Sequence, residues 1–388
     1  MKGNIVFRSW KARIGVAALA AVTLGSVGFT TAGATAAKPA AKPVKAVQII
    51  GSGSDAAYKP TSALDTLYNQ STGCNTIVTS GSQPLDYSCL ADSADTIKTE
   101  NYAHDVVSEE YPLGASVGIA QVCANLGKAN FARNVRAPKS TDCTGLHFVS
   151  DARDGLAWEC FGTCHGVTNL TKVQLQGIYG NCSINNWDQV GGSDAPIVVY
   201  GVVPGAGVKS NFNSYLGITD DTHCAPPDGK HVIHQNENQE ILANGDQANA
   251  IFYFSIASWL TNVAPHPDGS SLGSLETVTP TQARIADGTY PLGFNEGFVY
   301  CAGSTGAAPC PKKASKQTLN YIGETKGWIR KASATGDHKG AHAIDPLTGV
   351  NYRTEIENTL SSFGLVPIAY GPTGGSASGS SFCREIDG

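Results

Sequence analysis

The chain has 388 residues and carries 27 lysines and arginines against 32 aspartates and glutamates, a formal charge of −5. This acidic balance disfavours nucleic acid and anionic membranes as partners, because both repel a negatively charged protein. The 44 glycines and a charged fraction of only 15% indicate an ordered protein with many tight turns and exclude a disordered chain. The length exceeds the usual size of a single core and predicts two domains.

The first 36 residues are typical of a secretion signal. They open with four basic residues, Lys2, Arg8, Lys11 and Arg13. An apolar run over 14–29 follows, and Ala34-Thr35-Ala36 offers small residues for cleavage. The run is shorter than the about 20 residues of a membrane span, so we expect cleavage near Ala37 and an exported protein of the periplasm or cell surface. No cysteine lies near the cleavage point, so no lipid anchor is expected, and residues 37–46 are predicted to be a linker.

A buried strand is expected over 47–50, followed by a Gly-rich turn over 51–55 and a helix over about 62–69. This order exposes backbone N–H groups at a helix start, where a ligand can approach them. An ordinary strand-to-helix turn without a ligand has the same sequence pattern. A second helix is predicted over 116–126, ended by Gly127. The segment 131–138 is predicted to be a strand end that carries two arginines.

A second block, from about 155 to 286, begins with a short helix. Thr171 can cap its first turn and Gln174 can complete a capping box, while Gly180 and Asn181 end it. The pattern then predicts a strand over 197–203, a turn over 204–210, a helix over 211–216 and an apolar core helix over 250–260. Strand-like segments at 290–292 and 298–300 and a helix over 354–363 complete the expected order.

Eleven cysteines are expected to form several disulfides in an exported chain, with at least one thiol left over. Cys74 with Cys89 and Cys301 with Cys310 are the expected local pairs. Cys160 and Cys164-His165 are one residue too far apart for the usual haem-attachment motif, which favours a disulfide there. The histidines are scattered, so no metal and no cofactor is predicted.

The order and spacing of these landmarks resemble the phosphate-type (Pst) solute-binding proteins of ABC transporters, most closely their secreted Gram-positive branch. The segments 170–180 and 186–192 carry the resemblance most clearly. It implies an α/β, two-lobed periplasmic-binding-protein fold of type II, with crossing strands near 148–151 and 291–294 and a ligand cleft. It also implies a discontinuous first lobe, 47–153 with 291–388, and a second lobe over 154–290.

Four turns hold phosphate in that family, through hydroxyls, an acidic acceptor, backbone N–H groups and a guanidinium. The matching residues here are Ser54, Asp55, Ala56, Ala57, Ala115, Ser116, Arg133, Asn134, Arg136, Ala206, Gly207, Val208 and Lys209. Alanine or valine replaces the family's hydroxyls in the first, second and fourth turns, and Asn134-Val135 replaces a polar pair in the third.

These replacements should lower the affinity for phosphate. One lost ligand hydrogen bond costs about 0.5–1.5 kcal/mol, so four losses remove about 4 kcal/mol, or about three decades of affinity. Three explanations stay open: a one-residue misalignment of the turns, drift after loss of function, or a changed ligand. In the last case Arg133, Arg136 and Lys209 are kept for an anionic group, unless they are simply solvated or paired.

The prediction from the sequence is therefore an exported solute-binding protein that captures a small, anionic ligand by hinge closure, as a monomer working with an ABC permease. A secreted binding or scaffold protein without a transporter is one alternative, in keeping with the missing lipid-anchor cysteine. An exported hydrolase is not favoured, because the chain has no G-x-S-x-G elbow, no H-E-x-x-H motif and no convincing carboxylate pair.

Overall fold

The computed structural model describes residues 47–71, 74–77, 86–89, 105–110, 114–124, 129–262, 269–303, 308–323, 327–329, 348 and 350–368. The expected signal segment, the linker and the cleavage point lie outside these residues. No helix among them is long and apolar enough to span a membrane.

The first half of the described chain contains β1 (Val47–Gly53), α1 (Tyr58–Ser71), β2 (Cys74–Ile77), β3 (Asp86–Cys89), β4 (Asp105–Glu109), α2 (Ala115–Ala124), β5 (Phe131–Asn134), β6 (Leu146–Phe161), η2 (Cys164–Gly166), β7 (Asn169–Leu170), α3 (Lys172–Tyr179), η3 (Trp187–Val190), β8 (Val198–Val199) and β9 (Gly201–Val202). It continues with α4 (Gly207–Leu216), β10 (Val232–Ile233), α5 (Gln239–Asn244), β11 (Ala250–Ser255), α6 (Ile256–Asn262), β12 (Ser270–Leu272), β13 (Ser274–Leu275), α7 (Gln282–Ala286), β14 (Gly293–Cys301), α8 (Lys316–Ile322), α9 (Tyr352–Ser362) and β15 (Val366–Pro367).

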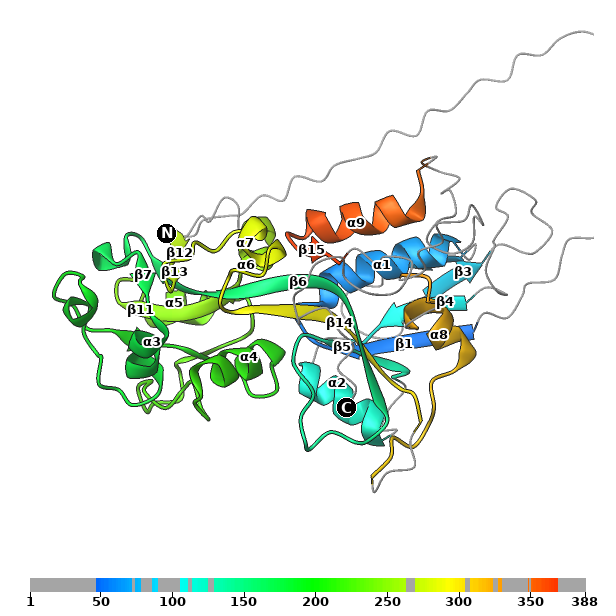
Figure 1. Ribbon diagram of the computed structural model, residues 1–388, viewed down its shortest axis with the longest axis horizontal. Helices are drawn as coiled ribbons and strands as arrows, with labels where there is room; N and C mark the ends of the chain where they lie inside the picture. The colour runs from blue at the N-terminus through cyan, green and yellow to red at the C-terminus, as the bar shows by residue number, and fades with distance from the viewer. Residues whose placement is uncertain are drawn as a thin grey trace, which may run out of the picture. The chain divides into compact units, whose positions relative to one another are not determined.

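The largest sheet has the strand order β4-β1-β5-β14-β6-β11-β8, with β12 and β15 also paired to β6. β1 is parallel to β4 and β5, whereas β14 is antiparallel to both β5 and β6. Its longest members, β6 and β14, run side by side through the molecule (Figure 1). The mixed sheet with helices packed on it is the α/β arrangement that the sequence predicted.

The two long strands pass from one hydrophobic core to another. Leu156 and Trp158 of β6 belong to the core built around α3, α4 and β11, whereas Val149 and Ala152 belong to the core of α1, α8 and α9. In β14, Phe294 lies in the first of these cores and Phe298 in the second. These strands therefore join the cores, as the crossing strands of a two-lobed fold do.

The predicted helix over 250–260 is wrong over its first half. Residues 250–255 form strand β11, whose six residues are all buried, and only 256–262 are helical. β11 has β6 on one side and β8 on the other, so its two edges are both paired. An apolar run buried on both faces lacks the alternation that distinguishes a strand from a buried helix.

Other elements differ from prediction mainly at their ends. α1 starts at Tyr58, directly after the Gly-rich turn, and has Pro60 in its first turn, where proline costs no hydrogen bond. The strand expected over 197–203 is divided at Tyr200, because β8 pairs with β11 and β9 pairs with β10. The strand-like segment at 290–292 precedes β14 instead of forming part of a strand.

The capping box predicted for the helix after Thr171 is confirmed. The Thr171 hydroxyl accepts from the Gln174 backbone N–H at 3.2 Å, and the Gln174 side chain accepts from the Thr171 N–H at 2.8 Å. We expect Thr171→Ala to lower the free energy of unfolding by about 1 kcal/mol, measured by urea denaturation. Val173→Ala, at a position 73% exposed on the same helix, is the control and should change it by less than about 0.5 kcal/mol. Equal effects of the two changes would contradict the capping role.

Four disulfides join described cysteines: Cys123–Cys143, Cys160–Cys164, Cys182–Cys224 and Cys301–Cys310. The predicted Cys301–Cys310 pair is thus confirmed, and the disulfide interpretation of the Cys160 segment is confirmed over haem attachment. Cys74 and Cys89 are opposite each other in the β2–β3 register, but their side chains and Cys383 lie outside the described part of the structure.

Candidate functional site

The four turns singled out from the sequence come together in the structure. The second turn meets the fourth, where the Ser116 N–H donates to the Gly205 carbonyl at 3.4 Å. A Cβ on Gly114 would lie 2.5 Å from that same carbonyl, so the close approach requires glycine. The third turn meets the fourth through Asn211, whose Nδ2 donates to the Val135 carbonyl at 2.5 Å.

Apolar side chains fill the place where these turns meet. Ala57, Ala115, Val135, Ala206 and Val208 are each at most 3% exposed and belong to one hydrophobic cluster. A Cβ on Gly207, at the start of α4, would clash with the Val135 side chain. The alanines and valines of these turns therefore pack on one another, and the turns contact each other directly.

Arg133 is fully buried and has partners on every side. Its Nη1 forms an ion pair with Glu109, its Nε donates to the Ser54 carbonyl at 3.1 Å, and its Nη2 donates to the Gly53 and Glu110 carbonyls at 3.3 Å. Burial lowers the pKa of Arg133 to about 10, which leaves it charged at neutral pH. This guanidinium ties β5 to the first turn.

Arg136 is also bound by neighbouring side chains. It binds Asp142 through two hydrogen bonds of 2.7 and 2.9 Å, and its Nε donates to the Ser116 hydroxyl at 3.1 Å. Asn134 accepts from the Arg136 N–H and donates to the Arg136 carbonyl, which shapes the third turn. Two-point pairing with a carboxylate is the strongest arrangement open to a guanidinium.

The Lys209 side chain binds two neighbouring aspartates, Asp220 and Asp221. Its amine forms ion pairs with Asp221, which is fully buried, and with Asp220, and also donates to the Val202 carbonyl at 3.1 Å. Asp221 further accepts from the Val202 N–H at 2.9 Å and the Tyr253 hydroxyl at 2.5 Å. All three cations considered for an anionic ligand are thus paired with carboxylates.

A cavity of about 680 Å³ lies beside these turns and next to the crossing strands. Its lining includes Asp55 and Ala56 from the first turn, Asp154 from β6, Glu296 from β14 and the segment 234–237. Asp55 accepts from the Gly114 N–H at 3.0 Å, and burial raises its pKa. The preceding residue, Ser54, has a buried hydroxyl with no hydrogen-bond partner among the described residues.

Two buried carboxyl groups of the crossing strands face this cavity. Asp154 pairs with Phe294 and Ala152 with Glu296 in the β6–β14 register, so both acidic side chains are on one face of the sheet. Asp154 accepts from the Ser255 hydroxyl at 2.5 Å and from the Ala257 N–H at 2.9 Å, and burial raises its pKa to about 6. Burial and the neighbouring Asp154 and Asp151 raise the pKa of Glu296 well above its ordinary value.

The sequence analysis missed Asp154, Gln235 and Glu296 as lining residues of this cavity. Asp154 and Glu296 could have been noticed, because charged side chains in long, mostly buried strands are uncommon without a partner or a role. Gln235 comes from an irregular segment after β10, and no local pattern marks it. Only the folded chain places these three together.

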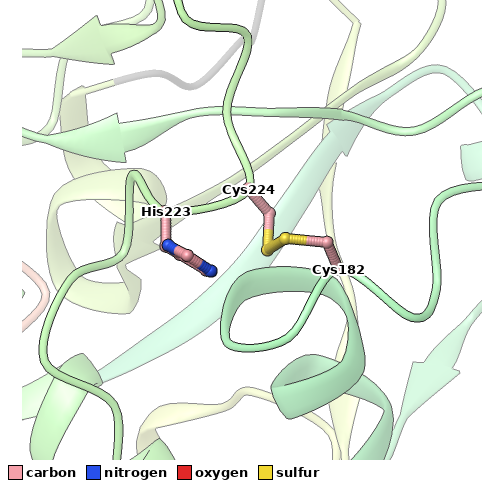
Figure 2. A group of neighbouring side chains, drawn as sticks. All are labelled: Cys182, His223 and Cys224. Atoms are coloured by element: carbon pink, nitrogen blue, oxygen red, sulfur yellow. A yellow bond between two sulfur atoms is a disulfide. The ribbon is translucent and has the colours of Figure 1, made fainter.

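One group of metal-binding residue types gathers elsewhere. Figure 2 shows His223 beside Cys182 and Cys224, and among the described residues only these bring three such ligand atoms within 4.8 Å. The two cysteines are joined as a disulfide, so neither offers the thiolate that a metal ion needs. The cluster is a structural link between the end of α3 and the loop after α4.

Comparisons with known proteins identify the family of this chain and structures with a similar fold. The family model described as "PBP superfamily domain" matches residues 27–322. An ABC-type phosphate transport receptor from Vibrio cholerae is 21% identical, with a TM-score of 0.52, and the match covers 82% of this chain and 99% of that one. A putative phosphate ABC transporter substrate-binding protein from Clostridium perfringens, with bound phosphate, is 19% identical, with a TM-score of 0.53 and coverage of 83% and 100%. No curated protein matches the chain.

Proposed function

Because this chain belongs to the PBP superfamily, we propose that it is an exported receptor that binds a small solute in its cleft and closes over it. The observation that carries the proposal is the family match over 27–322, which covers most of the described residues. Closure couples solute binding to the orientation of the lobes, because only the closed form contacts the solute from both sides. An ABC permease is the proposed partner of the monomeric receptor.

The packing of the four turns supports a solute other than tightly held phosphate. Their hydroxyls are replaced by alanine and valine, their meeting point is filled by Val135, and their three cations are paired with carboxylates. A phosphate placed there would displace buried apolar groups and compete with three established ion pairs. The cavity next to the crossing strands keeps its polar groups and offers the volume that small-molecule sites have.

We expect phosphate to bind the unmodified chain no tighter than tens of micromolar to millimolar, about three decades weaker than a micromolar-or-better parent site. Isothermal titration calorimetry on ligand-stripped protein measures this. The triple change Val135→Ser, Ala206→Ser and Val208→Thr should strengthen phosphate binding by more than about tenfold, because it returns hydroxyls and removes the filling side chain. Val173→Thr, on the exposed face of α3, is the control and should leave binding unchanged. Sub-micromolar binding by the unmodified chain would contradict this account of the turns.

The receptor function itself is tested with the solute that the protein retains. A native mass spectrum of the protein purified from its own host should show a bound small molecule, and small-angle scattering should show a smaller radius of gyration after that molecule is added back. N-terminal sequencing of the same sample should begin within a few residues of Ala37 if the chain is exported as proposed. A protein that retains no solute, and that no member of a broad solute library compacts, would overturn the receptor proposal.

A further inference from the structure

The cavity beside the crossing strands contains buried polar groups that have no partner. Gln235 is 5% exposed, and neither its Oε1 nor its Nε2 has a hydrogen-bond partner among the described residues. Glu296 is 3% exposed, and its Oε1 likewise has none. An unpaired buried polar group costs about 1–3 kcal/mol, and a charged group costs more. Because both side chains line the cavity, a ligand there can supply the missing contacts.

The charges around the cavity indicate which kind of ligand satisfies them. Four carboxyl groups line it, from Asp55, Asp154, Glu237 and Glu296. The basic residues in the lining are Lys59 and His234, so the acidic groups are in excess. Two of the four carboxyl groups are almost fully buried, and a buried carboxylate is favoured by an opposite charge close to it. The lining therefore favours a cation and disfavours phosphate.

The spacing of these groups and the rest of the wall favour an organic cation over a metal ion. Among the described residues, no three of the lining carboxylates bring oxygens within 4.8 Å of one another, as a bare metal ion would require. Part of the wall is apolar, formed by Ala56, Tyr58 and Leu365. A cavity of about 680 Å³ holds a molecule of many atoms, whose carbon skeleton can contact this apolar part while its donors reach the acids.

We propose that this cavity binds a small organic cation, an amine or a guanidinium compound, which donates hydrogen bonds to Glu296 and to the Gln235 Oε1. The inference rests on the proposed receptor function and names the class of its solute. Glu296 lies on β14 and Asp154 on β6, the two strands that join the cores. A cation held by Glu296 beside Asp154 lies against the crossing strands, at the place where a change in lobe orientation has to occur.

Calorimetry on the ligand-stripped mature protein tests the proposal with four probes: spermidine, agmatine, myo-inositol and inorganic phosphate. At least one of the two cationic probes should bind at least about tenfold more tightly than either myo-inositol or phosphate at neutral pH. Glu296→Gln keeps the shape of the side chain but cannot ionise when a cation is bound beside it, so it should weaken that cation by at least about tenfold. Glu159→Gln, a buried carboxyl of β6 outside the cavity, is the matched control and should change the affinity less than about twofold.

A second variant, at an exposed position, keeps the proposal testable if Glu296→Gln does not fold. Glu237 is exposed at the cavity, so Glu237→Gln should fold normally and weaken the cation by about two- to fivefold at low salt, with the difference shrinking at high salt. The inference is overturned if neither cationic probe binds more tightly than about 1 mM, or if Glu296→Gln and Glu237→Gln leave cation binding unchanged. Tight binding of myo-inositol or phosphate with closure of the lobes would overturn the cation proposal and leave the receptor function standing.

Discussion

Arg133→Met is expected to lower the free energy of unfolding by about 3–5 kcal/mol, because it leaves the carboxylate of Glu109 buried without its cation. Arg133 is fully buried and Glu109 is 2% exposed, so water cannot take over the lost contact. The substitution also removes hydrogen bonds to the carbonyls of Gly53, Ser54 and Glu110, which hold the first turn against β5. Urea denaturation monitored by tryptophan fluorescence measures the change.

Two further variants test whether the loss comes from the buried ion pair. Arg284→Met removes an exposed arginine whose partner Asp287 is also exposed, and it should change the free energy of unfolding by less than about 0.5 kcal/mol. Glu109→Gln combined with Arg133→Met should recover part of the lost stability, because no buried charge then remains unpaired. A loss below about 1 kcal/mol in Arg133→Met alone would show that this ion pair does not hold the turn.

A large pH dependence of stability is expected from Asp65, a buried carboxyl on α1. Burial raises its pKa to about 7, although the Tyr321 hydroxyl donates to it at 2.5 Å and Arg133 also favours its charged form. Between its unfolded pKa of about 4 and its folded pKa of about 7, the folded state binds more protons than the unfolded state. Stability contributed by this group is therefore present at low pH and is lost as pH rises through that window, by about 4 kcal/mol in all.

The variant Asp65→Asn isolates this contribution, because asparagine fills the same space and does not titrate. Its free energy of unfolding, relative to the unmodified protein, should rise by about 4 kcal/mol between pH 4 and pH 8 in parallel urea titrations. Tyr321→Phe removes the hydrogen bond that opposes the shift, so it should move the midpoint of the pH dependence further upward. A difference between Asp65→Asn and the unmodified protein that stays constant with pH would contradict the raised pKa.

Arg133 and Asp65 share one buried environment. Asp65, Arg133 and Glu109 all lie near the first turn, on α1, β5 and β4, and the positive charge of Arg133 acts on both carboxyl groups. Arg133, one of the three cations that the sequence offered for an anionic ligand, is thus a central structural cation. The four turns make close backbone contacts with one another, and their alanines and valines pack together in one hydrophobic cluster.

Local features of the sequence determined much of the secondary structure. The capping box at Thr171 and Gln174, the strand that precedes the Gly-rich turn, and the Cys301–Cys310 pair all depend on residues close together in the chain. Such interactions form within a few residues, so the sequence alone predicts them. The order of strands and helices also indicated the α/β class and, through the resemblance of the 170–180 segment, the two-lobed fold.

Only the tertiary structure decided which residues share a site. β11 is a strand because β6 and β8 pair with both of its edges, a condition that its apolar sequence does not contain. Arg133, Arg136 and Lys209 became structural because Glu109, Asp142 and Asp221 fold against them. Gln235, after β10, and Glu296, on β14, are 61 positions apart in the sequence and line one cavity. Burial and charge pairing depend on neighbours distant in the chain, and those neighbours are set by the packing of the whole fold.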